Sequence, residues 1–219
     1  MSDDRPLSEA LAPSPRKPRR ARLGLGHLLR LRFPAHARLT DELFEAIASA
    51  NPDLRLERTA RGDLEIMAPA GAESSNQNFR ISYQLARWTE NEGRGLGVGF
   101  DSSLGAILPN TAIRGPDAAW ITQARWDALT PEQREKYLSF CPDFVAELRS
   151  PSDRLNKLRD KLTEYIANGA RLGWLIDPKT GTVEIYRPGR AVEKLDRPAT
   201  LSGEEVLPGF VLDLSGILG

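Results

Sequence analysis

The sequence predicts an α/β fold with a mixed central sheet flanked by helices and a C-terminal hairpin. Two short apolar runs, at residues 115–121 and 144–148, have the length and composition of buried strands. Helical periodicity over residues 75–92 precedes these runs, and helical periodicity after residue 150 follows them. Strands that alternate with helices in this way are typical of a strand–helix–strand unit in an α/β sheet.

The composition sets limits on the class of protein and on the metals it could hold. The chain has 219 residues, enough for one domain with a substantial core, and its formal net charge is zero. Attraction to nucleic acid would therefore have to come from a local basic patch. One cysteine, Cys141, and two histidines argue against a zinc site of the usual Cys/His type. A metal held by this chain would have oxygen ligands, as Mg²⁺ or Mn²⁺ does.

Residues 1–33 differ in composition from the rest of the chain. Their proline and arginine content predicts a basic, disordered tail ahead of a folded domain over residues 34–219. Basic arms can lie along a phosphate backbone, although a solvated leader is the more common case. Arg30 and Arg32 interrupt the richest apolar stretch near the start, so we expect no membrane span, no secretory signal and a cytoplasmic location.

The first elements of the domain follow from local signals. Thr40 can cap a short helix that ends before Pro52. Residues 54–58 and 64–68 alternate between apolar and polar and are expected to form a hairpin. A longer helix is expected over residues 75–92, ending near a glycine. The side chains expected on its inward face are those of Phe79, Ile81, Leu85 and Trp88.

Later elements are shorter. Strand-like runs alternate with polar turns through the second half of the chain, which gives the sheet its remaining strands. The expected elements are strands at residues 96–100 and 104–108, a polar helical insertion over residues 131–137 that begins after Thr130, a hairpin of residues 173–177 with 183–186, and a closing turn and edge strand over residues 201–210.

Each of the two apolar strand-like runs contains a carboxylate, Asp117 in the first and Glu147 in the second. A carboxylate in such a place is normally paired, hydrogen-bonded or metal-bound, because an unpaired charge is costly to bury. Residues two apart share a face of a strand, so Glu147 and Arg149 project side by side. If the strands are neighbours, Asp117 and Glu147 can converge on one cation. A salt bridge such as Glu147 with Arg149 explains the spacing about as well.

The helix after the second run carries two lysines. Ser150 can cap this helix, with Asp153 closing a capping box. At about 100° per residue, Lys161 falls beside the apolar stripe and Lys157 lies farther toward solvent. Lys161 can therefore reach past the strand ends, although a lysine snorkelling at a helix edge is the more common case. The expected apolar stripe consists of Leu155, Leu158, Leu162, Tyr165 and Ile166.

Two carboxylates and a lysine are the parts that a divalent-metal phosphodiesterase site needs. Carboxylates hold Mg²⁺, which activates water, while Lys161 would stabilise the transition state and Arg149 could bind a phosphate oxygen. Glu73, near the start of the long helix, is a further candidate metal ligand, although an acidic residue there is more often only a favourable charge at a helix N-terminus. Asp143 is rejected because four strand residues separate it from Glu147 by about 13 Å.

As an ordered set, these residues resemble the Uma2 family of endonucleases, which has the PD-(D/E)XK restriction-endonuclease-like fold. The likeness spans about residues 37–217. It implies a restriction-endonuclease-like sheet, Mg²⁺ or Mn²⁺ as cofactor, and Asp117, Glu147 and Lys161 as catalytic residues. Arg149 stands at the lysine position of the plain nuclease motif, and in Uma2-like proteins the lysine is found in the next helix, which makes Lys161 its replacement. The matching segments are Gly115-Pro116-Asp117, residues 147–152, 161–165, 169–178 and 207–210.

The sequence therefore predicts a Mg²⁺-dependent endonuclease acting on DNA, with Asp117, Glu147 and Glu73 as metal ligands. A non-catalytic nucleic-acid-binding or regulatory module with the same fold is the alternative, motivated by the zero net charge and by Arg149. A hydrolase of a smaller phosphodiester is a third reading. The choice between DNA and RNA stays open, and a homodimer is expected because two-fold symmetry suits cutting both strands of a duplex.

Overall fold

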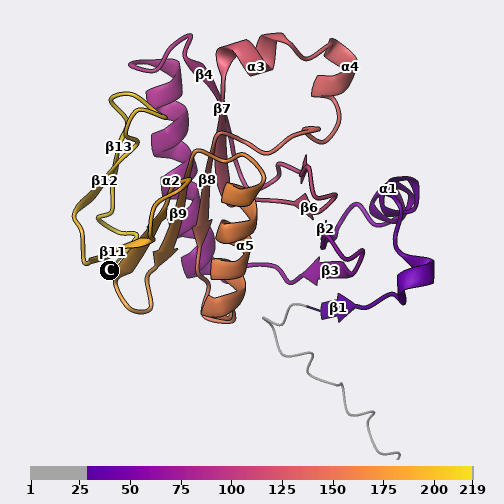
Figure 1. Ribbon diagram of the computed structural model, residues 1–219. Helices are drawn as coiled ribbons and strands as arrows, with labels where there is room; N and C mark the ends of the chain where they lie inside the picture. Colours follow the sequence, from indigo (N-terminus) through magenta and orange to yellow (C-terminus); the bar gives the residue numbers. More distant parts are fainter. Residues whose placement is uncertain (1–28, 219) are drawn as a thin grey trace, which may run out of the picture.

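A six-stranded mixed sheet forms the centre of the computed structural model, which describes residues 29–218 (Figure 1). Its strand order is β11-β10-β9-β8-β7-β4. The parallel neighbours β8 and β9 are joined by α5 (Leu155–Ala167), and the other neighbouring pairs are antiparallel. The predicted strand–helix–strand unit is therefore present. The strands are β4 (Gly97–Phe100), β7 (Ala118–Thr122), β8 (Phe144–Leu148), β9 (Leu172–Asp177), β10 (Thr182–Tyr186) and β11 (Glu193–Asp196).

A second, antiparallel sheet lies beside the first and has the order β1-β3-β2-β6-β5. We call it the N-terminal sheet. The sequence predicts the hairpin of β2 and β3 correctly but assigns it to a single central sheet, because alternation within a hairpin does not reveal which strand pairs with its edge. The predicted tail also ends too late, since β1 pairs with β3; residues 1–28 lie outside the described part. The strands are β1 (Leu29–Leu31), β2 (Arg55–Arg58), β3 (Leu64–Met67), β5 (Ala106–Ile107) and β6 (Ile113–Arg114).

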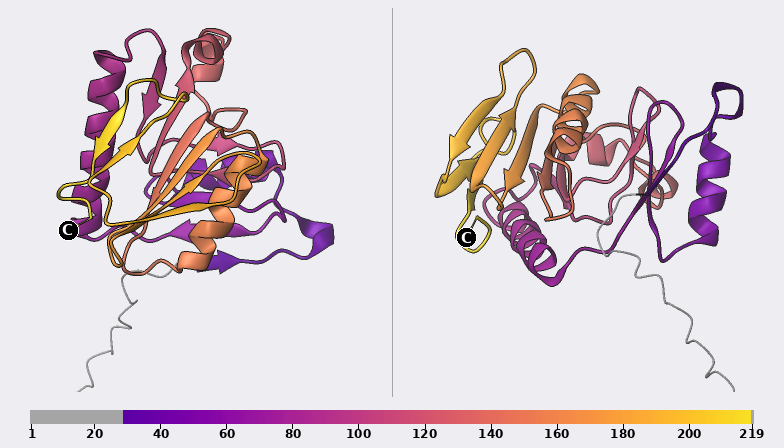
Figure 2. Two further views of the ribbon diagram at one scale, coloured as in Figure 1. Left: turned by 60° about the vertical axis from the view of Figure 1, so that its left-hand side comes forward. Right: turned by 90° about the horizontal axis from the view of Figure 1, so that it is seen from below.

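Helices cover both faces of the central sheet. Figure 2 shows α2 (Ala72–Glu90) and α5 on opposite sides of it. Leu85 of α2 belongs to the cluster that contains Trp120 and Trp174, whereas Leu162 of α5 packs with Val145 on the other face. A separate two-stranded sheet of β12 (Thr200–Ser202) and β13 (Val211–Asp213) adds Leu201 and Leu212 to the first cluster. The closing segment is thus a small hairpin of its own, and no single edge strand.

One expected core residue of α2 faces outward. Phe79 is 67% exposed and stacks on the exposed Tyr83, with 6.3 Å between ring centroids. Ile81, Leu85 and Trp88 recur at helical spacing and are buried as predicted. Phe79 lies two residues before Ile81, which is about 200° around the helix, so it belongs to the opposite face.

The short helices confirm the cap predictions in two of three places. The Thr40 side chain accepts a hydrogen bond from the Leu43 amide at the start of α1 (Asp41–Ala50), and Thr130 forms a capping box at α4 (Pro131–Arg134). By contrast, α5 begins at Leu155, so the predicted cap at Ser150 is wrong. The remaining short elements are the 3-10 turn η1 (Ala35–Ala37) and α3 (Gln123–Asp127). Among residues 29–218, no helix is long and apolar enough to cross a membrane.

Candidate active site

Asp117, directly before β7, lies across from Glu147 of β8. Ala118 pairs with Ala146 in the antiparallel register of β7 and β8, so the residue before Ala118 faces the residue after Ala146. Asp117 Oδ2 also accepts a hydrogen bond of 2.9 Å from the Leu148 amide. Both carboxylates project from the face of the sheet that α5 covers, and they are 8% and 3% exposed. The condition set by the sequence prediction, that the two strands are neighbours, is therefore met.

Lys161 completes this group from α5. Its Nζ lies 2.8 Å from Glu147 Oε1 and donates to Glu57 Oε1 at 2.9 Å and to the Gly115 carbonyl at 3.1 Å. The side chain is 9% exposed, so the ammonium is buried among oxygen acceptors. Lys157, one turn earlier, is about half exposed and lies 3.6 Å from Asp160. The wheel argument thus distinguishes the two lysines correctly.

Glu57 of β2 is a site residue that the sequence reasoning missed. Its Oε1 accepts from Lys161 and also, at 3.1 Å, from the Gly115 amide, and its side chain is 3% exposed. Glu57 is paired directly opposite Glu65 in the hairpin of β2 and β3. Two like charges in a cross-strand pair are destabilising unless cations lie between them. The pairing of Glu57 with Glu65 indicates a nearby cation, but the sequence reveals this pairing only if the register of the hairpin is known.

Arg114 of β6 supplies the cation that the glutamate pair requires. Its guanidinium lies 3.2 Å from Glu57, 2.7 Å from Glu65 and 2.6 Å from Glu164 of α5. The N-terminal sheet is thus connected to α5 by buried ion pairs through Arg114 and Lys161. These contacts fix the position of Lys161 relative to the two strands that carry Asp117 and Glu147.

The pKa values of Glu147 and Glu57, the two carboxylates that contact Lys161, shift in opposite directions. Burial raises the pKa of Glu147 to about 7; the Lys161 ammonium opposes this, and the Asp117 and Glu57 charges add to it. Burial would also raise the pKa of Glu57, but Lys161 and Arg114 outweigh it and lower that pKa to about 2. Burial would lower the pKa of Lys161, yet Glu147 and Glu57 together raise it. Glu147 therefore holds a proton more readily than Glu57 does.

Tyr165 and Arg55 border the carboxylates. The Tyr165 hydroxyl donates to Glu147 Oε1 at 3.2 Å, and burial raises the pKa of this phenol well above its usual value. Arg55 Nη1 lies 3.4 Å from Asp117 Oδ1, and another nitrogen of the same guanidinium donates to the Gly115 carbonyl. The Arg55 side chain is 35% exposed, so the open edge of the site is on this side.

Two other predicted site residues have different neighbours. Arg149 Nη1 lies 2.7 Å from Asp177 Oδ2, so its ion-pair partner is Asp177 and the salt bridge with Glu147 that the spacing allowed is not formed. Glu73 is exposed in the first turn of α2 and accepts from Gln77 at 3.3 Å. Among the described residues, no hydrogen bond or ion pair links Glu73 to Asp117, Glu147 or Lys161.

The donor set fits a hard divalent cation. Asp117 Oδ1 has only the long contact to Arg55, and Glu147 Oε2 has no hydrogen bond within the described part of the chain. Residues 29–218 contain no group of three or more His, Cys, Asp or Glu side chains arranged to hold a metal ion. Mg²⁺ does not require one, since it is usually bound by one or two carboxylates together with water and substrate phosphates. A cation between Asp117 and Glu147 would also relieve their repulsion.

Comparisons with known proteins bear on the fold and on the family. The fold matches the crystal structure of "a putative nuclease belonging to DUF820" from Anabaena variabilis with a TM-score of 0.61 and 19% sequence identity. The match covers 74% of this chain and 89% of that chain. At this level of identity the likeness is one of fold.

The family follows from the sequence match. The model of the Uma2 family, described as "Putative restriction endonuclease", matches residues 41–215. The chain belongs to the Uma2 family, so the predicted family and fold class are confirmed. A comparison with curated proteins finds no match.

Proposed function

We propose that this protein is a divalent-metal-dependent endonuclease that hydrolyses phosphodiester bonds in DNA. The observation that carries the proposal is the convergence of Asp117 and Glu147 on neighbouring strands with the Lys161 ammonium 2.8 Å from Glu147. Membership of the Uma2 family and the nuclease-like fold support the reaction class. DNA as substrate and the metal requirement are part of the proposal.

Asp117 and Glu147 would hold Mg²⁺ or Mn²⁺. When bound, such an ion supplies a Lewis acid and an activated water for phosphodiester hydrolysis. The Asp117 carboxylate is oriented by the Leu148 amide, and Glu147 is oriented by Tyr165 and Lys161. Both ligands are therefore held in place before substrate arrives, which lowers the reorganisation that binding requires.

Lys161 would act as the electrostatic catalyst. Glu57 and the Gly115 carbonyl hold its ammonium beside Glu147, where its positive charge can offset the negative charge that develops on the phosphate. Its raised pKa keeps it protonated at neutral pH, so Lys161 acts here as a hydrogen-bond donor and a charge, and never as the general base. Glu57 is then a positioning residue for this lysine.

A second function is favoured by Arg149, which stands at the lysine position of the nuclease motif and pairs with Asp177. It is a nucleic-acid-binding or regulatory module that keeps the nuclease fold without catalysis. Metal titration discriminates between the two functions. Such a module binds DNA equally well with and without Mg²⁺ and is insensitive to Glu147→Gln, whereas a nuclease loses cleavage with that substitution.

The direct test is cleavage of supercoiled, linear and single-stranded DNA, and of RNA, with Mg²⁺ or Mn²⁺. We expect Asp117→Asn and Glu147→Gln each to lower the rate at least about 100-fold, since each removes a proposed metal ligand. Asp127→Asn, in α3, is the matched control and should cleave like the wild type. Glu73→Gln tests the third proposed ligand, and light scattering tests the expected homodimer.

The proposal fails if the wild-type protein cleaves no nucleic acid with either metal while Asp117→Asn leaves the affinity for Mn²⁺ unchanged. Cleavage of RNA but not DNA would support the proposed catalytic residues and overturn DNA as the substrate.

A further inference from the structure

We propose that a pocket in the N-terminal sheet, about 360 Å³ in volume, binds the phosphate backbone of the nucleic acid on which the candidate site acts. This inference rests on the proposed function and adds a binding surface to it. We call the surface the arginine pocket. It is lined by Arg30, Arg32, Phe33, Arg38, Arg61 and Asp63.

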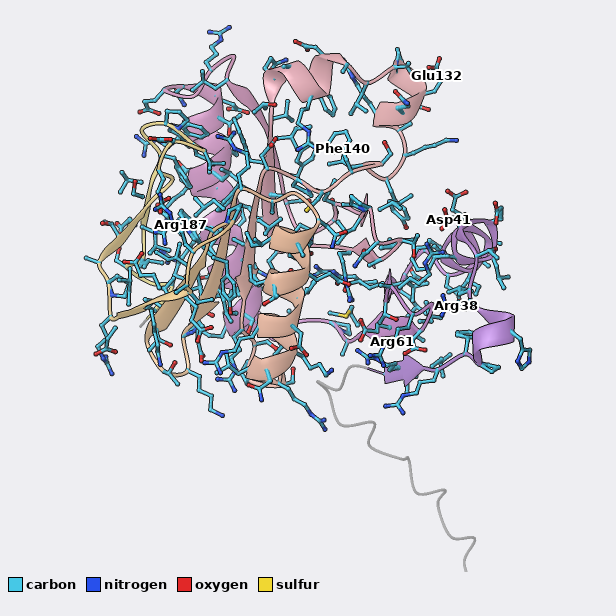
Figure 3. All side chains as sticks on the ribbon, viewed as in Figure 1. Arg38, Asp41, Arg61, Glu132, Phe140 and Arg187 are labelled. Atoms are coloured by element: carbon cyan, nitrogen blue, oxygen red, sulfur yellow. The ribbon has the colours of Figure 1, made fainter. Side chains whose placement is uncertain are left out.

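The hairpin turn between β2 and β3 builds the pocket. The Thr59 amide donates to the Asp63 carbonyl at 2.9 Å and the Gly62 amide donates to Thr59 at 2.8 Å, which closes a tight turn at Arg61. Gly62 has a φ of +84°, and a Cβ there would meet Arg38 at 3.1 Å. The absence of a side chain at Gly62 therefore lets the Arg38 segment pack directly on the turn. Figure 3 shows Arg38 and Arg61 at the same end of the N-terminal sheet.

The arginines of the pocket carry excess positive charge. Arg30 pairs with the buried Glu65, and Asp63 accepts a hydrogen bond from the Phe33 amide. Arg32, Arg38 and Arg61 are exposed, and among residues 29–218 none of these three forms an ion pair. In a chain whose formal net charge is zero, this is the kind of local basic patch that attraction to a polyanion requires.

Direct contacts connect the arginine pocket to the candidate active site. Arg30 Nε donates to Glu65 at 2.8 Å, and Glu65 lies 2.7 Å from Arg114. Arg114 in turn contacts Glu57, which accepts from Lys161. One line of alternating charges therefore runs from the pocket to the catalytic lysine. A polyanion held at the pocket would lie on the same sheet that positions Lys161.

The chemistry of the lining favours nucleic acid over an acidic protein. Guanidinium groups bind phosphate oxygens through two parallel hydrogen bonds, and three exposed guanidinium groups border this pocket. Phe33 is partly buried and lines the same pocket, so an aromatic surface lies among the arginines. Aromatic rings beside basic groups are a common arrangement for binding exposed bases.

The test compares two triple variants in binding fluorescent DNA without divalent metal, so that no cleavage occurs. The first variant is Arg32→Ala with Arg38→Ala and Arg61→Ala. The control removes the same charge from exposed positions near the β11 side, the side that Arg187 marks in Figure 3. It consists of Arg171→Ala, Arg190→Ala and Lys194→Ala. A third protein with lysine at all three pocket positions keeps the charge without the guanidinium geometry.

We expect the pocket variant to bind DNA at least about tenfold more weakly at about 0.1 M salt, because three phosphate contacts are lost. The slope of log K against log salt should become shallower by about 2–3. The control should stay within about twofold of the wild type, and the lysine variant should keep the salt slope. Thermal unfolding of each protein ensures that the comparison is made on folded chains.

Three outcomes overturn the inference: an unchanged affinity and salt slope in the pocket variant, an equal loss in the control, or wild-type binding that polyglutamate displaces as well as DNA does. The proposed function is tested separately by Asp117→Asn. If that variant binds normally without cleaving while the pocket variant binds like wild type, only the arginine pocket is refuted. If the pocket variant loses binding but wild type cleaves nothing, only the nuclease function is refuted.

Discussion

Lys161→Met is the substitution that separates a catalytic lysine from a structural one. The wild-type ammonium is buried and contacts Glu147, Glu57 and the Gly115 carbonyl. Methionine keeps most of the length and apolar stem of the side chain but removes the charge and all three contacts. Two buried carboxylates then lose their shared cation.

The expected cost follows from that loss. Removing one partner of a buried ion pair destabilises a protein by about 3–5 kcal/mol, because the remaining charge is left uncompensated. For a domain of this size, such a loss lowers the melting temperature by about 6–20 °C. If Lys161 also offsets charge in the transition state, the cleavage rate falls by about 10²–10³, measured below the new melting temperature.

Two further variants make the assay decisive. Lys157→Met is the matched control, because Lys157 is half exposed and its contact with Asp160 is 3.6 Å; it should change stability by less than about 0.5 kcal/mol. The double variant Lys161→Met with Glu57→Gln removes one of the two carboxylates that lose their contact with the Lys161 ammonium. It should regain more than about 1 kcal/mol of stability without regaining cleavage. The reasoning is refuted if Lys161→Met unfolds and cleaves like the wild type.

Three other predictions follow from single sites. Arg149→Ala should lower the free energy of unfolding by about 2–4 kcal/mol, because the buried Asp177 loses its ion-pair partner. DNA affinity should stay within about twofold of the wild type, whereas weaker binding at unchanged stability would support a phosphate contact. Burial raises the pKa of Cys141 to about 12, so the stability that the protonated thiol contributes to the fold is lost as pH rises from about 9 to 12. A thiol reagent at about pH 8 should modify Cys141 only in denaturant, and rapid labelling of the folded protein would contradict this. Gly97→Ala should destabilise by more than about 2 kcal/mol in chemical denaturation, because the new Cβ would overlap the Ile121 carbonyl and the Trp120 ring; wild-type stability would show that β4 is placed differently.

Strand and helix periodicity predicted the parts of the site that depend on local geometry. The bounds of β8 agree with the expected run, and Glu147 shares a face with Val145, as alternation requires. Lys161 lies at the buried edge of α5 because its angle on the helical wheel is fixed by the apolar stripe. These features depend only on neighbours in the sequence, so the sequence alone was sufficient for them.

Long-range pairing is what the sequence could not supply. Glu57 contacts Lys161 across 104 residues, and this contact requires the N-terminal sheet to lie against α5. No local pattern records that packing. The prediction that Asp117 and Glu147 converge also assumed that β7 and β8 are neighbours. The sequence could not show this pairing, and the structure does.

Turn chemistry explains the misplaced start of α5. Ser150 and Asp153 have the spacing of a capping box, and their side chains do interact: the Ser150 amide and hydroxyl donate to Asp153 Oδ2 at 2.8 and 2.6 Å. In the structure these hydrogen bonds close a turn ahead of the helix, which begins at Leu155. The same local signal fits both arrangements, because Ser and Asp bind backbone groups in turns as well as at helix caps.

The most direct test of the account is a crystal of the protein soaked in Mn²⁺ and measured for anomalous scattering. The account predicts one strong peak within about 2.0–2.5 Å of a carboxylate oxygen of both Asp117 and Glu147, with Lys161 still beside Glu147. A peak held elsewhere, or none at these two residues at saturating Mn²⁺, would contradict it.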